Sequence, residues 1–246
     1  MRSLAAAIGN LLPKKLTYRP NCSYVSRMQR MTDQPTTFAI FVYDDVEPID
    51  IGATYGVLSI ARRVIPQIKM FTVAEQSGEV RLTNDLIMRA QYGFSDCPPF
   101  DIMIVTGGPG WQQQCRDTKV LGFLRNAASR ADIASVCTGG MILAAAGLLE
   151  GRAATTRRHG VSGENTPLQR MKGGYSGVQV LEALVVDNGT VVTGGGVSLG
   201  VDTMLYLLGR LYGESKTGEV AQLLEYDRAR AANMAGLAIH RTGPPQ

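Results

Sequence analysis

A cysteine at position 137 lies in a sequence pattern that suits a catalytic nucleophile. It follows the short run Ile133-Ala-Ser-Val and precedes Thr-Gly-Gly and an alanine-rich stretch. A buried strand, one residue and then a helix with small neighbours is the arrangement of a nucleophile elbow. The positive end of the helix dipole should lower the pKa of the thiol, so we expect Cys137 to react as a thiolate. The other cysteines fit the role of small, inert apolar side chains: Cys22, Cys97 and Cys115.

Asp50 is the candidate acid or base. It lies between Ile49 and Ile51 at the start of a helical stretch, just after Pro48. Apolar neighbours would desolvate the carboxylate and raise its pKa toward the range that suits acid–base catalysis. The alternative is an ordinary helix N-cap, a role that aspartate often takes.

The chain has glycine clusters at 107–108, 139–140 and 194–196, which suggest tight turns where the backbone approaches another group closely. Gly107-Gly108 follows a buried apolar run, but no lysine or GxGxxG pattern accompanies it, so a phosphate loop is disfavoured. We instead expect the backbone N–H groups of Gly108 and Thr138 to stabilise developing negative charge.

The two histidines give weaker signals. His159 lies in a polar segment, where a solvated loop position is the simpler interpretation, and a Cys–His pair with Cys137 stays open. His240 lies near the end of the chain and no role is expected for it. No CxxC pair and no metal-ligand spacing is present, so the residues themselves do not indicate a metal site.

Alternating strands and helices must position these residues. Apolar runs of strand length occupy residues 38–43, 68–74, 101–106 and 133–136, with a shorter one at 153–156. Helical spacing occupies residues 55–63, 119–131, 141–149, 201–212 and 216–226. This alternation predicts the α/β class, with a mostly parallel sheet covered by helices on both faces. Because sites form at the carboxyl ends of parallel strands, Asp50, Gly107-Gly108 and Cys137 should converge.

Two further segments depart from this alternation. Residues 79–90 resemble a hairpin, and Asn188-Gly189 between two β-branched runs predicts a second hairpin with a type I′ turn. Residues 157–177 are polar and are expected to be irregular.

Charge and composition exclude several classes of protein. Before Asp33 the chain carries six basic residues and no acid, and the rest has 19 basic against 21 acidic residues. The body is therefore not a nucleic-acid binder by charge. The apolar stretch 141–149 is too short to span a bilayer, which takes about 20 residues.

We expect one domain over residues 37–235, with a disordered basic extension at 1–36 and a flexible tail at 236–246. Few cysteines favour a cytoplasmic location, and organellar targeting by residues 1–36 is the alternative.

Several segments together resemble the DJ-1/PfpI superfamily, and within it the isonitrile hydratases. The segments that carry the resemblance are FAIFVYDDVEPID (38–50), FSDCPPFD (94–101), SVCTG (135–139), AAGLLEGR (145–152) and VTGGGVSLGVD (192–202). The resemblance covers about residues 37 to 230. It implies a flavodoxin-like fold, of the kind seen in class I glutamine amidotransferases, usually a homodimer without metal or cofactor.

The resemblance also implies roles for single residues. Cys137 would be the nucleophile that attacks the terminal carbon of an isonitrile, Asp50 its proton-transferring partner and Thr138 the neighbouring hydroxyl. The amides of Gly108 and Thr138, beside Gly107, would bind the developing anion. The family motif Ala-Thr-Thr-His-Trp reads Ala154-Thr-Thr-Arg-Arg here, so Arg157 replaces a histidine. An arginine stays protonated, so it could stabilise an anion but would transfer protons poorly.

Two alternative functions stay open at this point. One is a thiol hydrolase or glyoxalase-like enzyme that acts on small carbonyl or amide compounds. The other is a sensor of ligands or oxidants, since a reactive cysteine can report oxidation. Related domains precede helix-turn-helix modules in regulators, but the chain ends at Gln246 without room for one. We therefore expect an enzyme with a small-molecule substrate.

Overall fold

The structure is a computed structural model that describes residues 35–242. Its centre is a seven-stranded sheet in the order β11-β9-β10-β6-β5-β1-β2. The strands are β1 (Thr36–Phe41), β2 (Ile68–Val73), β5 (Ile102–Val105), β6 (Asp132–Ser135), β9 (Val185–Asp187), β10 (Val191–Gly194) and β11 (Ile239–Arg241). The first four and β10 are parallel, whereas β9 and β11 run the opposite way. The expected mostly parallel sheet is confirmed.

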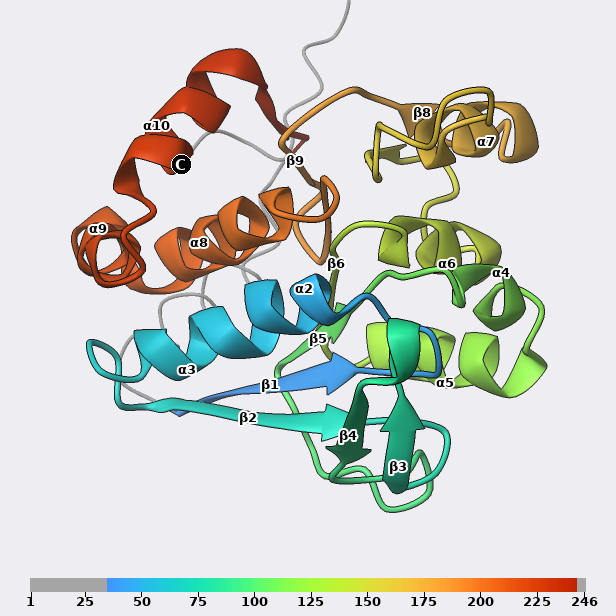
Figure 1. Ribbon diagram of the computed structural model, residues 1–246, viewed down its shortest axis with the longest axis horizontal. Coiled ribbons are helices and arrows are strands. Elements are labelled where there is room, and N and C mark those ends of the chain that lie inside the picture. The colour runs from blue at the N-terminus through green and yellow to red at the C-terminus, as the bar shows by residue number, and fades with distance from the viewer. Residues whose placement is uncertain (1–34, 243–246) are drawn as a thin grey trace, which may run out of the picture.

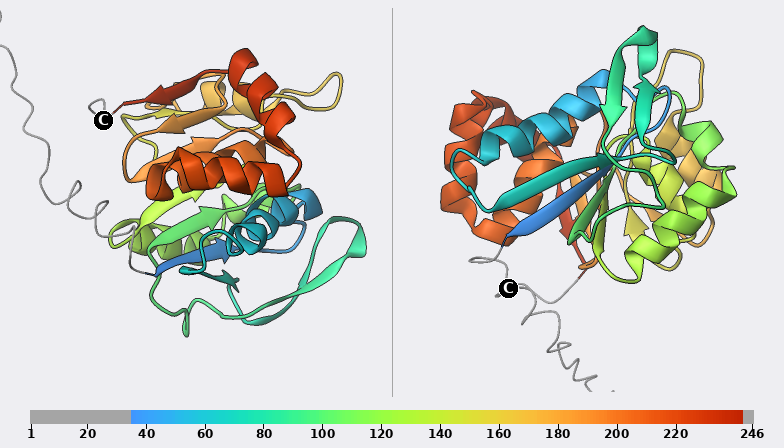
Figure 2. Two further views of the ribbon diagram at one scale, coloured as in Figure 1. Left: turned by 90° about the vertical axis from the view of Figure 1, so that its left-hand side faces the viewer. Right: turned by 90° about the horizontal axis from the view of Figure 1, so that it is seen from below.

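Helices cover both faces of the sheet (Figures 1 and 2). One face carries α3 (Val57–Ala61) and α8 (Leu199–Tyr212), with α9 (Glu214–Leu223) and α10 (Asp227–Gly236) outside them. The other carries α5 (Thr118–Ala128) and α6 (Gly139–Ala145), with α4 (Trp111–Gln114) beside α6. Every residue of β5, β6 and β10 is buried, which explains why these strands read as continuous apolar runs. The flavodoxin-like α/β class is thereby confirmed.

The helix after β1 is built from three segments. They are α2 (Pro48–Ile51), the π-helical η1 (Gly52–Gly56) and α3. Pro48 occupies the first turn of α2, where its missing N–H costs nothing. Wider π-helical turns are rare and occur frequently at functional sites. Here the π segment directly follows the turn that carries Asp50.

Both expected hairpins are present. The first pairs β3 (Gly78–Arg81) with β4 (Ile87–Ala90) around η2 (Thr83–Asp85), and the second pairs β9 with β10. The type I′ turn is wrong, because among residues 188–191 only Gly189 has a positive φ. Asp187 pairs with Val192, so the connection is longer than a two-residue turn. The Asp187 carboxylate accepts a hydrogen bond of 2.7 Å from the Gly189 N–H and fixes this longer loop.

The region expected to be irregular contains secondary structure. It holds α7 (Pro167–Gly174), and β7 (Ala153–Ala154) pairs with β8 (Gln179–Val180) just beyond it. Helix α7 begins with a capping box, in which Thr166 and Gln169 exchange side-chain to backbone hydrogen bonds. The sequence Thr-Pro-Leu-Gln carries this signal, but few apolar residues follow it.

The expected flexible tail at 236–246 is wrong for its first part. After α10, the chain forms β11 at the edge of the sheet, parallel to β9. The Arg241 guanidinium lies 5.4 Å from the centre of the Tyr206 ring, and its Nε donates to the Tyr206 hydroxyl over 3.1 Å. The domain therefore extends to Thr242. The expected extension at 1–36 lies outside the described residues up to position 34, and β1 already begins at Thr36.

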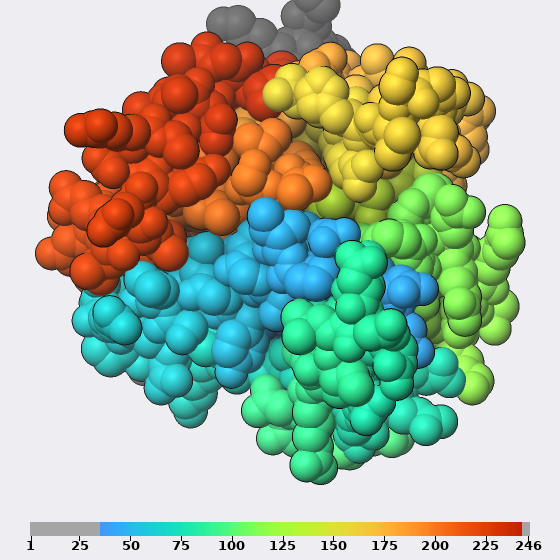
Figure 3. All heavy atoms as spheres, viewed as in Figure 1, coloured from blue at the N-terminus to red at the C-terminus, as the bar shows by residue number. Residues whose placement is uncertain are grey.

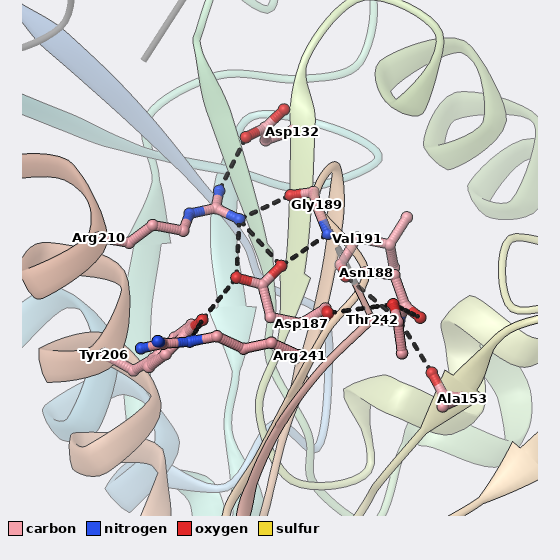
Figure 4. A network of polar contacts seen from close by, with 10 residues as sticks. All are labelled: Asp132, Ala153, Asp187, Asn188, Gly189, Val191, Tyr206, Arg210, Arg241 and Thr242. Atoms are coloured by element: carbon pink, nitrogen blue, oxygen red, sulfur yellow. Dashed lines mark hydrogen bonds and ion pairs between the residues drawn. The ribbon is translucent and has the colours of Figure 1, made fainter. Parts of the chain in front are cut away.

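A buried polar network joins β11, β9, β6 and α8 (Figure 4). Arg210 is at its centre and donates to the carboxylates of Asp132 (2.8 Å) and Asp187 (3.2 Å) and to the Gly189 carbonyl oxygen. Asp132 begins β6, whereas Cys137 follows the opposite end of that strand. The network therefore supports the sheet at the amino end of β6, whereas the candidate site lies beyond the carboxyl end of that strand. Over residues 35–242, no helix is long and apolar enough to cross a membrane.

Candidate active site

Cys137 lies on the expected elbow between β6 and α6. Its φ of +52° is in the left-handed region, which is unusual for any residue except glycine and marks strain. The backbone holds this conformation from two sides. The Cys137 N–H donates to the Gly195 carbonyl oxygen (2.9 Å), and the Cys137 carbonyl oxygen accepts from the Thr156 hydroxyl (2.8 Å). Small residues are required here, because a side chain at Gly139 would collide with the Val105 carbonyl oxygen.

Asp50 lies within the first turn of α2 and is fully buried. It is not an N-cap: Glu47 holds that position, and Asp50 Oδ2 accepts a hydrogen bond of 2.8 Å from the Gly107 N–H. Its flanking residues do not explain its burial, since Ile49 is 45% exposed. Adjacent residues on a helix point in different directions, so it is the packed turn at Gly107 that removes Asp50 from water. Oδ1 has no conventional hydrogen-bond partner among the described residues.

The Gly107-Gly108 turn joins the aspartate to the cysteine. A Cβ at Gly107 would lie 2.5 Å from the Thr138 nitrogen and 2.8 Å from the Cys137 Cβ, so only glycine allows this approach. The Gly108 N–H donates to the Thr138 hydroxyl oxygen over 2.9 Å. The convergence of Asp50, Gly107-Gly108 and Cys137 is therefore confirmed. The Gly108 amide, however, orients Thr138 in the free protein and is open to a substrate only if that hydroxyl moves.

The pKa of Asp50 is raised, as expected, whereas the pKa of Cys137 is raised although it was expected to be lowered. Burial raises the pKa of Asp50 from 3.8 to about 7, against the opposing effect of the Gly107 hydrogen bond. Burial and the nearby Asp50 charge raise the pKa of the Cys137 thiol to about 12. The expected thiolate is therefore wrong for the free protein, because desolvation outweighs the favourable end of a short helix. At pH 7 Cys137 is thus a thiol beside a carboxyl group that is about half ionised, and only the ionised form can accept the thiol proton.

Two backbone donors approach the sulfur, and one of them was not anticipated from the sequence. The N–H groups of Thr138 and Val197 both favour the thiolate form of Cys137. Val197 has a φ of +57°, a genuine outlier for a β-branched residue. It follows the cluster Gly194-Gly195-Gly196, which indicated a close backbone approach without showing what was approached. The structure places that loop against the cysteine.

Arg157 and His159 lie near this loop but differ in their relation to the site. Arg157 is half-buried, and its positive charge lowers the pKa of both Asp50 and Cys137. Its Nε donates to the His159 carbonyl oxygen (2.8 Å). The His159 side chain is exposed, and no hydrogen bond links it to Cys137 in the described part of the chain. The charged neighbour of the pair is therefore an arginine.

Figure 3 shows a hollow in the surface where three segments meet: the blue start of the first helix, the orange glycine loop and the yellow segment that follows strand β7. Cys137 itself is only 1% exposed, so a substrate must be small or must displace part of this rim. Two cavities of about 520 and 240 Å³ lie elsewhere and do not include Cys137 in their walls. Within residues 35–242, no group of three or more metal-ligating side chains was found.

Comparisons with known proteins identify the family and the fold of the chain. A model of the DJ-1/PfpI family matches residues 36–209, which include every residue of the site. Isonitrile hydratase of Pseudomonas putida is 33% identical over 187 residues, which are 75% of this chain and 76% of that enzyme. The HTH-type transcriptional regulator GbdR of Pseudomonas aeruginosa is 23% identical, over 85% of this chain and 55% of the regulator. The crystal structure of Drosophila melanogaster DJ-1beta shares the fold, with a TM-score of 0.65 and 21% identity over 78% of this chain and 98% of that chain.

Proposed function

The chain belongs to the DJ-1/PfpI family, and on that premise we propose that it is an enzyme that hydrates an isonitrile to an N-substituted formamide. The observation that carries the proposal is the buried Asp50 carboxyl, held by Gly107 and coupled to the thiol of Cys137 on a strained elbow. A sequence identity of 33% to an isonitrile hydratase supports this choice of substrate class. A base next to a nucleophile is the minimum that covalent catalysis requires.

The reaction divides into two steps at Cys137. In the first, Asp50 accepts the thiol proton while the sulfur adds to the terminal carbon of R–N≡C. Return of that proton to the carbon gives the thioimidate R–N=CH–S–Cys137. In the second, water adds to the same carbon with Asp50 as base, and the C–S bond breaks. The products are R–NH–CHO and the free thiol, so the net change is the addition of one water molecule.

The raised pKa values suit this sequence of proton transfers. A carboxyl group with a pKa of about 7 is well matched to accept and return a proton near neutral pH. The Thr138 and Val197 amides stabilise the sulfur as it develops negative charge, before its bond to carbon is complete. The thiol is thus activated during the reaction instead of being stored as a thiolate.

The same site suits a sensor less well than an enzyme. Oxidation depends on thiolate character and access to the oxidant, and Cys137 has a raised pKa and 1% exposure. A thiol hydrolase or glyoxalase-like enzyme would use the same Cys137–Asp50 pair on a carbonyl carbon. It differs in needing a stabilised oxyanion, and the Gly108 amide that could provide one is bonded to Thr138.

The direct test is to incubate the protein with cyclohexyl isocyanide and to measure N-cyclohexylformamide by mass spectrometry. Wild type should form the product and Cys137→Ala should not, while Cys97→Ala serves as the matched cysteine control and should retain activity. Absence of product with wild type, or equal product with Cys137→Ala, would remove the proposal. Turnover of methylglyoxal in place of the isocyanide would favour the glyoxalase-like alternative.

A further inference from the structure

Arg157 is fixed to the same wall of the site as the nucleophile. It follows Thr156, whose hydroxyl donates to the Cys137 carbonyl oxygen over 2.8 Å. Its aliphatic stem lies against Gly196, where an added Cβ would come within 2.6 Å of the Arg157 Cβ. The neighbouring Gly195 in turn accepts the hydrogen bond of the Cys137 N–H. The position of the arginine is therefore determined by the contacts that shape the elbow.

The guanidinium group of Arg157 has no ion-pair partner among residues 35–242. Its Nε is bonded to the His159 carbonyl oxygen, which orients the group and leaves its two terminal nitrogens without a described acceptor. The adjacent Arg158 differs, because it forms an ion pair with Glu182 over 3.2 Å. The Nε hydrogen bond is exposed, so the guanidinium group can be reached from solvent while its charge acts on Asp50 and Cys137. The two terminal nitrogens are therefore available to a negatively charged group of a ligand.

We propose that the terminal nitrogens of Arg157 bind a carboxylate on the substrate, so that the enzyme prefers isonitriles that carry an acidic group. The inference rests on the proposed hydratase function and defines its substrate class. An arginine presents two parallel N–H donors that match the two oxygens of a carboxylate. The positive charge also offsets the repulsion that an anionic substrate would meet from ionised Asp50, which must act as the base.

A matched pair of substrates isolates the charge. Potassium isocyanoacetate carries the carboxylate, and methyl isocyanoacetate has the same isonitrile with the charge removed. With wild type, kcat/KM should be at least about 10-fold higher for the acid, as expected for a charged hydrogen bond in a partly buried site. Arg157→Gln removes a charge that lowers the pKa of both Asp50 and Cys137, so kcat/KM should fall for both substrates. The fall should be about 10- to 100-fold larger for the acid than for the ester.

Two control variants separate charge from structure. Arg157→Lys keeps the positive charge but lacks the two parallel N–H donors, so it should keep part of the preference for the acid. Arg158→Gln, at the neighbouring position, should leave the preference unchanged. Equal kcat/KM for acid and ester with wild type would overturn the inference. So would a loss in Arg157→Gln that is the same for both substrates, because the arginine would then act through Cys137 and Asp50 alone.

A binding measurement keeps the inference testable if the proposed hydration is wrong. N-formylglycine, the product expected from isocyanoacetate, should bind wild type more tightly than its methyl ester in isothermal titration calorimetry. Arg157→Gln should remove this difference while its circular dichroism spectrum stays that of wild type. Preferential binding of N-formylglycine without turnover of either isonitrile would retain the anion site and reject hydration. Turnover of both isonitriles with no difference in binding would retain hydration and reject the anion site.

Discussion

The Cys137 thiol lowers the pKa of the Asp50 carboxyl group, and the Asp50 carboxylate raises the pKa of the thiol. The two groups therefore ionise in a fixed order, with the carboxyl first at about pH 7 and the thiol only near 12. At pH 7 the carboxyl group is therefore about half ionised, whereas the thiol keeps its proton. Catalysis by this pair requires the carboxylate to take that proton when substrate arrives.

This order predicts the pH dependence of activity. In the proposed reaction the ionised form of Asp50 is the base, so kcat/KM should rise with pH through about 7 and then reach a plateau. It should fall about tenfold for each pH unit well below the pKa. A pH–rate profile from 5 to 9 with a neutral isonitrile measures this. A profile that falls with rising pH would mean that protonated Asp50 acts as an acid in the first step.

The same carboxyl group should limit stability. Its pKa is about 7 in the folded protein and about 3.8 in the unfolded chain, so the folded state holds the proton more tightly. Unfolding free energy therefore decreases as pH rises from 4 to 7, by at most about 4 kcal/mol. Asp50→Asn removes the ionisation and keeps an oxygen that can accept from Gly107. It should abolish turnover and raise the unfolding free energy at pH 8 by about 1–3 kcal/mol.

The increase in unfolding free energy that Asp50→Asn produces should become smaller as the pH is lowered to 4, because the wild-type carboxyl group is then neutral in the folded state. Asp85→Asn is the matched control, because Asp85 is exposed and has a positive φ that asparagine also tolerates. Its effect should stay within about 0.5 kcal/mol at either pH. Urea denaturation at pH 4 and pH 8 measures these effects. Equal destabilisation of Asp50→Asn at both pH values would contradict the claim that burial of the ionised Asp50 lowers stability.

The glycine turn provides a third prediction. Gly107→Ala places a methyl group against the Thr138 nitrogen and the Cys137 Cβ, so either the elbow or the turn must move. A displacement of about 1 Å between reacting groups can reduce the rate about 100-fold, and we expect a loss of at least that size in kcat. Gly122→Ala is the control, because a Cβ there meets nothing within 4 Å and favours helix α5. Near-normal activity of Gly107→Ala would show that the turn does not position the pair.

The sequence predicted the positions of Cys137 and Asp50 better than their chemistry. The small residues around Cys137 predict an elbow because few other structures need them, and parallel strands bring Asp50 and Gly107 to the same edge. The pKa of the thiol could not be predicted in this way, because it depends on burial by residues distant in sequence. Val197 was also missed, since its role comes from a backbone N–H and a left-handed φ, and neither is a property of a valine side chain. Strand β11 was missed because three residues near a chain end carry too little periodicity to indicate an edge strand.

The last prediction concerns the network at the opposite edge of the sheet. Arg210 is 4% exposed as a side chain and bridges Asp132 and Asp187, which are 12% and 9% exposed. Removing one partner of a buried ion pair leaves the other charges uncompensated, so Arg210→Met should lower the unfolding free energy by about 3–5 kcal/mol. The matched control is Arg230→Met: its ion pair with Glu214 involves a 71% exposed carboxylate, and its loss should cost at most about 1 kcal/mol.

Because the network supports the amino end of β6 and Cys137 follows the carboxyl end, the folded fraction of Arg210→Met should keep the wild-type KM and kcat. Urea denaturation and kinetics measured on the same preparations test both statements. A loss of kcat without a loss of stability would show instead that this edge of the sheet controls the elbow.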